Sequence, residues 1–186
     1  LTYILKKKEK SKVSKFANAK LKTIAVRFPK NKIIRSLLKK LTFPLAIPSA
    51  NISTGVSPTE PLDVVDEFKN KIKFILNGGK SAIGLESTVI NLSGKPTILR
   101  PGAISYIQIE KILRKQVSNV TKSKFVISPG MHKKHYSPGI PIKLNSIKPD
   151  YKAAFIAFGK KYKMKKHMFN LSKKGSLKEA AKNLYK

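Results

Sequence analysis

The chain has 186 residues, of which 41% are hydrophobic, and this is enough for a packed core in one substantial domain or slightly more. Its formal net charge of +31 means that its surface should attract polyanions weakly. It has no cysteine and no apolar run near the ~20 residues of a membrane span, which excludes a disulfide framework and a thiolate site, indicates no membrane partner, and fits a reducing, cytoplasmic compartment.

The basic residues are unevenly divided between the two types but are spread along the whole chain. Four of the 40 are arginine, and the lysines occur in every segment. Such a spread is typical of compositional drift toward lysine. Dense positive charge also suits a nucleic-acid partner, because phosphate binding releases counterions. We favour drift, and binding of double-stranded RNA or tRNA stays open as the alternative.

The first part of the chain alternates between strand and helix patterns. A strand is expected from Leu1, and TIAVRFP predicts a second strand in which Thr23 and Arg27 face the same side. The segment NKIIRSLLKKL has the apolar stripe of an amphipathic helix, and FPLAIP predicts a short buried strand.

A further helix is predicted from about Pro61 to Lys73. Thr59 is the expected N-cap, and a capping box that starts at Ser57 is the alternative, so the start is defined to within about two residues. The spacing of its apolar side chains predicts that they face inward. These side chains are Leu62, Val65, Phe68 and Ile72.

The pattern then changes to short strands. KFILNGG predicts a strand that ends in a turn, and a hairpin is predicted from strands over 87–92 and 96–100 joined at Ser93-Gly94. YIQIEKILRK predicts a helix. Because helices and strands interleave, the fold class indicated is a layered α/β domain over residues 1–115.

The segment 116–140 has a different texture and predicts a linker, because its Pro-Gly pairs exclude a regular element. After it, AAFIAFG and HMFNLS predict two strands, and a helix is expected from about Ser176. These elements indicate the start of a second α/β domain over 141–186. The chain begins with Leu1 and ends within a predicted helix, so we expect it to be an internal fragment of a longer protein.

The loop PSANISTGVSPTEP, residues 48–61, concentrates small hydroxyl and amide side chains where a helix is predicted to begin. Ser49, Asn51, Ser53 and Ser57 lie within it. The N–H groups and positive dipole end of a helix N-terminus favour an anion, so the loop is a candidate anion site. A capped turn with incidental hydroxyls is the alternative.

Arginine on predicted strands is the second signal, because this chain otherwise uses lysine. Arg27 and Arg100 would each suit bidentate recognition of carboxylate or phosphate, or a structural ion pair. Glu86 precedes a strand and is interpreted mainly as a structural salt-bridge partner. His132 and His135 have a spacing that a helix would need for a metal, but the flanking Pro-Gly pairs disfavour a helix. No catalytic acid, base, nucleophile or metal site is predicted.

Three segments in order carry a resemblance to a known family: PSANISTGVSPT, ILNGGKSAIGLESTVINLSGKPTILRPGAI and SPGMHKKHY. Together they resemble the threonylcarbamoyl-AMP synthase family in its long, two-domain form. The resemblance implies a YrdC-like twisted open sheet with flanking helices over 1–115. It further implies that the linker over 116–140 closes over the active site and that a smaller Rossmann-like domain starts at 141.

The resemblance implies a nucleotidyltransferase, L-threonylcarbamoyladenylate synthase. Such an enzyme forms threonylcarbamoyl-AMP and pyrophosphate from L-threonine, bicarbonate and ATP, for threonylcarbamoyladenosine modification of tRNA. Mg²⁺ would arrive with ATP, and tRNA threonylcarbamoyl transferase proteins would act downstream. A non-catalytic RNA-binding module of the same fold is the alternative.

The family's contacts carry over to this sequence by motif. Arg27, the backbone of Ile47 and Ser87 would contact L-threonine. The ATP contacts would be Thr23, Ser49, Ser57, Arg100 and Tyr136. The family's N-terminal basic nucleotide-contacting motif and its threonine-contacting aromatic residue have no counterpart in this sequence, so the chain alone is expected to have little or no synthase activity.

Overall fold

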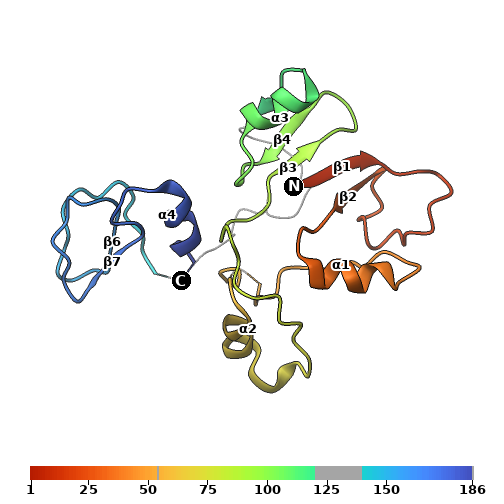
Figure 1. Ribbon diagram of the computed structural model, residues 1–186. Coiled ribbons are helices and arrows are strands. Elements are labelled where there is room, and N and C mark those ends of the chain that lie inside the picture. The colour runs from red at the N-terminus through yellow and green to blue at the C-terminus, as the bar shows by residue number, and fades with distance from the viewer. Residues whose placement is uncertain (54, 120–139, 186) are drawn as a thin grey trace. The chain divides into compact units, whose positions relative to one another are not determined.

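The computed structural model describes residues 1–53, 55–119 and 140–185 (Figure 1). These residues fall into two compact units, which we describe separately. In the described residues, one unit comprises 1–48 and 86–119 and the other comprises 49–85 and 140–185. No helix within the described ranges combines the length and apolarity needed to span a bilayer. The predicted mixed α/β class is confirmed, whereas the domain boundaries at 115 and 140 stay predictions.

The first unit is organised around a five-stranded sheet with the order β2-β1-β3-β4-β5. The pairs β1–β2 and β3–β4 are antiparallel, whereas β1–β3 and β4–β5 are parallel. The predicted hairpin is therefore present as β3–β4. The strands are β1 Thr2–Lys6, β2 Thr23–Arg27, β3 Val89–Asn91, β4 Thr97–Arg100 and β5 Ser118–Asn119.

Helix α3, Tyr106–Leu113, lies against the β3–β4 hairpin (Figure 1). It forms because Ser105 and Gln108 make a capping box and because its apolar side chains recur with helical spacing. On this face of the sheet Ile109 packs in a buried cluster with three other side chains, namely Ile90, Ile98 and Val117. A second cluster of Ile4, Val89 and Leu99 completes the core of the unit.

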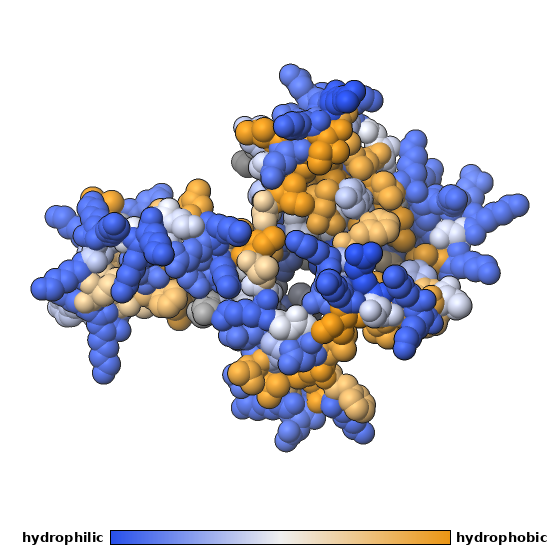
Figure 2. All heavy atoms as spheres, viewed as in Figure 1, coloured by the Kyte–Doolittle hydropathy of each residue, from blue (hydrophilic) through white to orange (hydrophobic). Residues whose placement is uncertain are grey.

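Helix α1, Lys32–Lys39, forms where its amphipathic pattern predicted a helix. The side chain of Asn31 caps it by accepting hydrogen bonds from the N–H groups of Ile33 and Ile34. None of its side chains is buried. Space-filling Figure 2 shows hydrophobic surface around β1, β3, β4 and α3 as well, and hydrophilic residues cover much of the rest of this view.

The second unit contains two parallel strands, β6 Phe155–Ala157 and β7 Met168–Asn170, and helix α4, Leu177–Asn183. Both strands and the helix agree with the prediction for this segment. Phe155, Ala157 and Met168 form its buried cluster, with Tyr162 packed against Phe155 at 5.0 Å between ring centroids.

Helix α2, Pro61–Phe68, is shorter than the predicted 61–73, because residues Lys69–Lys71 continue it as a 3₁₀ turn. The prediction of Thr59 as N-cap is wrong, since Glu60 occupies that position. The N–H and hydroxyl of Thr59 both donate to Asp63 Oδ2, at 2.7 and 3.1 Å. The prediction of an inward apolar face is also wrong, because no α2 residue is buried and Leu62 is 68% exposed.

Two predicted strands do not form. The segments FPLAIP (43–48) and KFILNGG (73–79) have no regular secondary structure. Hydrophobic content allowed strands there, but a strand also needs a neighbouring backbone to satisfy its N–H and C=O groups. The two sheets in the described part of the chain do not include these segments.

Candidate functional site

Two arginines converge on the hydroxyl of one serine in the first unit. Arg27 donates from Nη2 to Ser87 Oγ at 2.8 Å, and Arg100 donates from Nη2 to the same oxygen at 3.2 Å. Ser87 Oγ also lies 2.8 Å from Thr2 Oγ1. The cluster therefore concentrates two fixed positive charges around two hydroxyl groups.

The register of the sheet brings these side chains together. Thr2 pairs with Arg27 in β2 and with Val89 in β3, and Val89 pairs with Arg100 in β4. Ser87 lies two positions before Val89 and so projects toward the same side. These pairings bring together the strand ends on one side of the sheet. They are the end of β2, the start of β1, the start of β3 and the end of β4.

A β-bulge contributes to the position of Arg100. Val89 pairs with Arg100 and Ile90 pairs with Ile98, so Leu99 is the extra residue. Bulges bend the strand locally and redirect the neighbouring side chains. Leu99 is buried with Val89, whereas Arg100 turns its guanidinium toward the segment before β3.

Arg100 is held on several sides. Its Nε and Nη2 both donate to the carbonyl oxygen of Ser87, at 3.1 and 2.9 Å. Its Nη2 lies 3.3 Å from Glu86 Oε2, with side-chain exposures of 16% for Arg100 and 22% for Glu86. The ion pair that the sequence favoured for Glu86 is present. The partly buried pair fixes the guanidinium while leaving it accessible to an anion.

Arg27 is more exposed than the sequence led us to expect, because β2 is the edge strand of the sheet. Its Nε donates to Thr2 Oγ1 at 3.1 Å. The guanidinium is thus oriented by two neutral hydroxyl groups, an arrangement that suits an arginine meeting an anionic ligand.

A glycine allows the segment before β3 to lie where it does. A Cβ atom on Gly102 would lie 2.6 Å from the carbonyl oxygen of Glu86 and 2.8 Å from the carbonyl carbon of Ser87. Atoms of the backbone cannot yield at such distances without moving the chain. Gly102 therefore permits the close backbone approach that places Ser87 between the two arginines.

Thr23 is not part of this cluster. Thr23 and Arg27 are at opposite ends of β2, and along a strand four residues correspond to about 13 Å. Ile47 is exposed in an irregular segment of the first unit. Ser49 and Ser57 belong to the second unit. Tyr136, with His132 and His135, lies outside the described residues.

Ser57 lines a hollow of the second unit, and its surroundings are acidic. The hollow is formed by Ala50, Val56, Ser57, Pro58, Asp63, Asp66, Glu67 and Tyr185. Hydrogen bonds from the backbone N–H of Thr59, aided by those from Glu60 and the Thr59 hydroxyl, hold the pKa of Asp63 below its usual range. Asp63 thus accepts hydrogen bonds from the N–H groups at the start of α2, and this contact is a capped turn.

No group of three or more histidine, aspartate and glutamate side chains within the described ranges is arranged to hold a metal ion. Sequence reasoning identified Arg27, Ser87 and Arg100 but missed Thr2 and Gly102. The signal for Thr2 is its place at the start of a strand, but which residues it meets depends on pairing with β2 and β3, and no local pattern gives that register.

Two family models cover the chain. Residues 1–102 match the Sua5_yciO_yrdC model, which is described as "Telomere recombination". Residues 104–186 match the model described as "Threonylcarbamoyl-AMP synthase, C-terminal domain". The two matches follow one another along the sequence without overlap.

Curated relatives bear the name threonylcarbamoyl-AMP synthase. The Pyrococcus abyssi protein is 38% identical over 147 residues, which are 76% of this chain and 43% of that protein. The Schizosaccharomyces pombe protein is 40% identical, with 68% of this chain and 33% of that protein covered. The Bacillus subtilis protein is 36% identical, with 71% and 39% covered. The chain thus spans less than half the length of each of these relatives.

Solved structures agree with these sequence matches. A crystal structure of P. abyssi Sua5 complexed with L-threonine superposes with a TM-score of 0.79 at 29% identity, covering 99% of this chain and 59% of that chain. A variant of the same protein with a histidine and a tyrosine replaced by alanine gives a TM-score of 0.78 at 28% identity, covering 99% and 58%.

Proposed function

This chain belongs to the threonylcarbamoyl-AMP synthase family, and from this premise we propose that it contributes to an L-threonylcarbamoyladenylate synthase. The reaction joins L-threonine, bicarbonate and ATP into threonylcarbamoyl-AMP and releases pyrophosphate. The observation that carries the proposal is the convergence of Arg27 and Arg100 on Ser87, in a chain whose P. abyssi relative has been solved with L-threonine.

The proposed L-threonine site is built on Arg27 and Ser87. A planar guanidinium pairs with a carboxylate through two parallel N–H groups, and a serine hydroxyl can donate a third hydrogen bond. The backbone of Ile47 would complete the site. Arg27 suits this role because it donates to the hydroxyl groups of Thr2 and Ser87, which compete weakly with a carboxylate.

The proposed ATP contacts are Arg100 and the hydroxyl-bearing residues carried over from the family motif. Arg100 would neutralise phosphate charge, and its ion pair with Glu86 sets its orientation beforehand. Tyr136 would cover the nucleotide and exclude water. The remaining contacts are Thr23, Ser49 and Ser57.

The chemistry depends on positioning and charge. The threonine amine attacks the carbon supplied by bicarbonate and water is lost, which gives a carbamate. A carbamate oxygen then attacks the α-phosphorus of ATP, and pyrophosphate leaves. Such a phosphoryl transfer requires aligned reactants and neutralised phosphate charge more than a protein nucleophile. Mg²⁺ is proposed to enter with ATP as part of that substrate, because its ligands would be mainly phosphate oxygens and water.

The product is a labile mixed anhydride, so a protein that transfers the threonylcarbamoyl group must act next. We place this step in the cytoplasm, with tRNA threonylcarbamoyl transferase proteins as the acceptors. The chain would therefore supply the activated group for threonylcarbamoyladenosine in tRNA.

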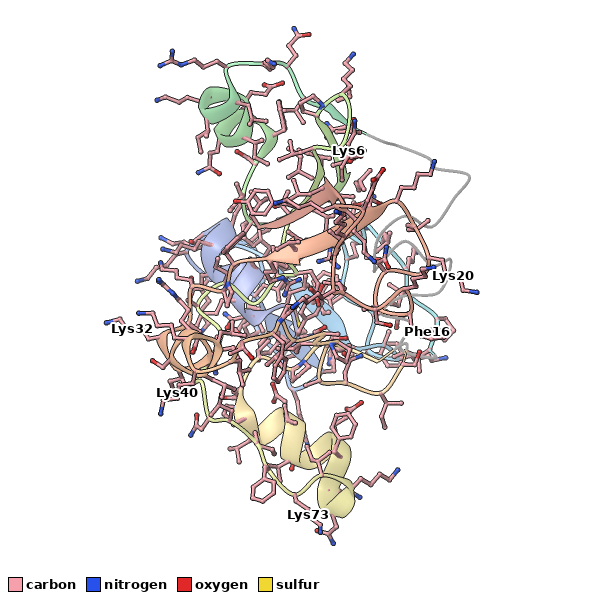
Figure 3. The ribbon with its side chains drawn as sticks, turned by 90° about the vertical axis from the view of Figure 1, so that its right-hand side faces the viewer. Lys6, Phe16, Lys20, Lys32, Lys40 and Lys73 are labelled. Carbon is pink, nitrogen blue, oxygen red and sulfur yellow. The ribbon has the colours of Figure 1, made fainter. Side chains whose placement is uncertain are left out.

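An RNA-binding role is the second candidate, and one surface favours it. The loop 7–22 between β1 and β2 contains seven lysines and one glutamate. The side chain of Asn18 holds the loop by donating to Thr23 O at 3.1 Å, and Phe16 is 88% exposed. Figure 3 shows Phe16 and Lys20 on this loop, with Lys6 at its start. Lysines can bind phosphates and an exposed aromatic ring can stack on a base.

Binding measurements separate the two candidates. We would titrate the 186-residue chain with L-threonine, with ATP, and with a tRNA at two salt concentrations, and compare an Arg100→Ala variant. The synthase proposal expects saturable L-threonine binding, and loss of ATP binding in the variant at fixed salt. It is contradicted if neither ligand binds while tRNA binds with a steep salt dependence.

A further inference from the structure

The hydrogen bonds of the Ser87 hydroxyl determine whether Thr2 donates to it or accepts from it. Ser87 Oγ accepts from Arg27 and from Arg100, which occupies both of its lone pairs. Its own hydrogen can then only be donated, and Thr2 Oγ1 lies 2.8 Å away. In this state Ser87 is therefore the donor and Thr2 the acceptor.

Thr2 Oγ1 also accepts a second hydrogen bond, from Nε of Arg27 at 3.1 Å. One oxygen thus orients both groups that are proposed to meet the L-threonine carboxylate. Without the Thr2 hydroxyl, the Nε–H of Arg27 would lose its acceptor and the Ser87 hydroxyl would lose its partner on β1, although both arginines could still donate to Ser87.

The hydroxyl of Thr2 is held firmly. Thr2 is 7% exposed, and its backbone pairs with β2 on one side and β3 on the other. Its N–H donates to the carbonyl oxygen of Thr88 at 2.8 Å, next to Ser87 in the chain. A β-branched side chain on a strand also has few rotamers, so the position of Oγ1 is fixed by the backbone.

We propose that Thr2 is a positioning residue for L-threonine binding, an inference that rests on the proposed function. The hydroxyl of Thr2 orients the guanidinium of Arg27 and the side chain of Ser87, so that both can bind a carboxylate without rearranging. When the carboxylate arrives, Ser87 turns its hydrogen to the ligand. Because the carboxylate also takes the N–H that Arg27 directs at Ser87, one lone pair of Ser87 Oγ is released, and Thr2 can then donate its own hydrogen to it.

The test compares Thr2→Val, which keeps the shape but removes the hydroxyl, with Thr2→Ser, which keeps the hydroxyl. We expect Thr2→Val to weaken L-threonine binding about tenfold and to leave ATP binding within about twofold. Thr2→Ser should bind L-threonine within about threefold of the unsubstituted chain. The matched control is Thr97→Val, since the hydroxyl of Thr97, the first residue of β4, donates to Lys95 O in the preceding turn.

Equal L-threonine binding by Thr2→Val and the unsubstituted chain would overturn the inference, as would an equal loss in Thr2→Val and Thr2→Ser. A second measurement needs no variant: the Nε–H of Arg27 should exchange with solvent more slowly than that of Arg35 on exposed α1. Equal exchange rates would also overturn it.

If the unsubstituted chain does not bind L-threonine, the proposed function fails for this chain. The role of Thr2 in orienting Arg27 then stands or falls on the exchange rates alone. The same holds if Thr2→Val does not fold, so the failure of the function and the failure of the inference remain distinguishable.

Discussion

At the scale of single residues, the account depends on what each group near Ser87 can donate or accept. Arg27 donates to the hydroxyl groups of Thr2 and Ser87, whereas Arg100 also faces the carboxylate of Glu86. The two guanidinium groups therefore differ in what an anion must displace. A carboxylate that binds Arg27 competes only with neutral hydroxyl groups, whereas an anion that binds Arg100 competes with the carboxylate of Glu86.

The substitution Arg27→Lys tests whether L-threonine binding needs the planar guanidinium group of Arg27 or only its positive charge. Lysine keeps the charge but presents a point donor on a flexible stem, so it cannot orient on Thr2 and Ser87 together. We expect L-threonine binding to weaken about tenfold, which corresponds to about 1.4 kcal/mol, with ATP binding little changed. Calorimetric titration measures both. Arg35→Lys on α1 is the control, and equal affinity in the two variants would contradict this role of Arg27.

Glu86→Gln tests the competition at Arg100. The amide keeps a hydrogen-bond acceptor but removes the negative charge that holds the guanidinium. We expect ATP to bind two- to fivefold more tightly at low salt, with less difference at high salt because the competing interaction is electrostatic. The free energy of unfolding should fall by less than about 1 kcal/mol, since the pair is partly exposed. Weaker ATP binding would show that Glu86 serves mainly to orient Arg100.

At the scale of elements, sequence patterns predicted what local interactions determine. Helices α1, α3 and α4 and the β3–β4 hairpin were predicted because caps, periodicity and a turn lie within each segment. Pairing between distant segments was not predictable in this way. The runs 43–48 and 73–79 look like strands but lack a partner in the described sheets, and the Thr2–Arg27 register emerges only when β1 meets β2.

The close approach of Gly102 to the segment before β3 predicts a strong effect of one methyl group. Gly102→Ala would force the backbone at Glu86 and Ser87 to move, at a cost of about 1–3 kcal/mol in the free energy of unfolding. L-threonine binding should weaken as Ser87 moves away from Arg27. Thermal unfolding and titration measure the two effects. Gly94→Ala is the control, since its Cβ would meet nothing within 4 Å, and matching behaviour of the two variants would refute the explanation.

Asp63 stabilises the N-terminus of helix α2 by an amount that depends on pH. Backbone N–H donation from Thr59 and Glu60 lowers the pKa of Asp63, so its stabilisation is fully present above the unfolded pKa, near 3.9. It is lost as pH falls through the lower folded pKa. We expect Asp63→Asn to cost about 1 kcal/mol at pH 7 and nothing measurable once the pH lies below both values.

Denaturant unfolding of the 186-residue chain at a series of pH values measures this difference. Asp66→Asn, one turn further along the same helix, is the control because Asp66 is exposed and caps no N–H group. A difference between Asp63→Asn and the unsubstituted chain that persists unchanged at the lowest pH would contradict the assigned cause.

At the scale of the whole molecule, two features cannot be read from any one segment. The first is the charge of +31, which the sequence attributes to scattered lysines and which the loop 7–22 partly concentrates. The second is the distribution of the predicted site. The sequence grouped Ser49 and Ser57 with Arg27 and Arg100 from motif order. The two serines belong to one unit and the arginine cluster to the other, so this grouping stays a prediction.

The central claim is that Arg27 and Arg100 face one ligand-binding position at Ser87. The most direct measurement is a proton–nitrogen spectrum of the arginine Nε–H groups in the 186-residue chain during L-threonine titration. The chain has four arginines, so Arg35 and Arg114 act as controls within the same molecule. We predict that the Arg27 and Arg100 signals shift along one saturable curve while the other two stay fixed. Unchanged signals, or equal shifts of all four, would contradict the account.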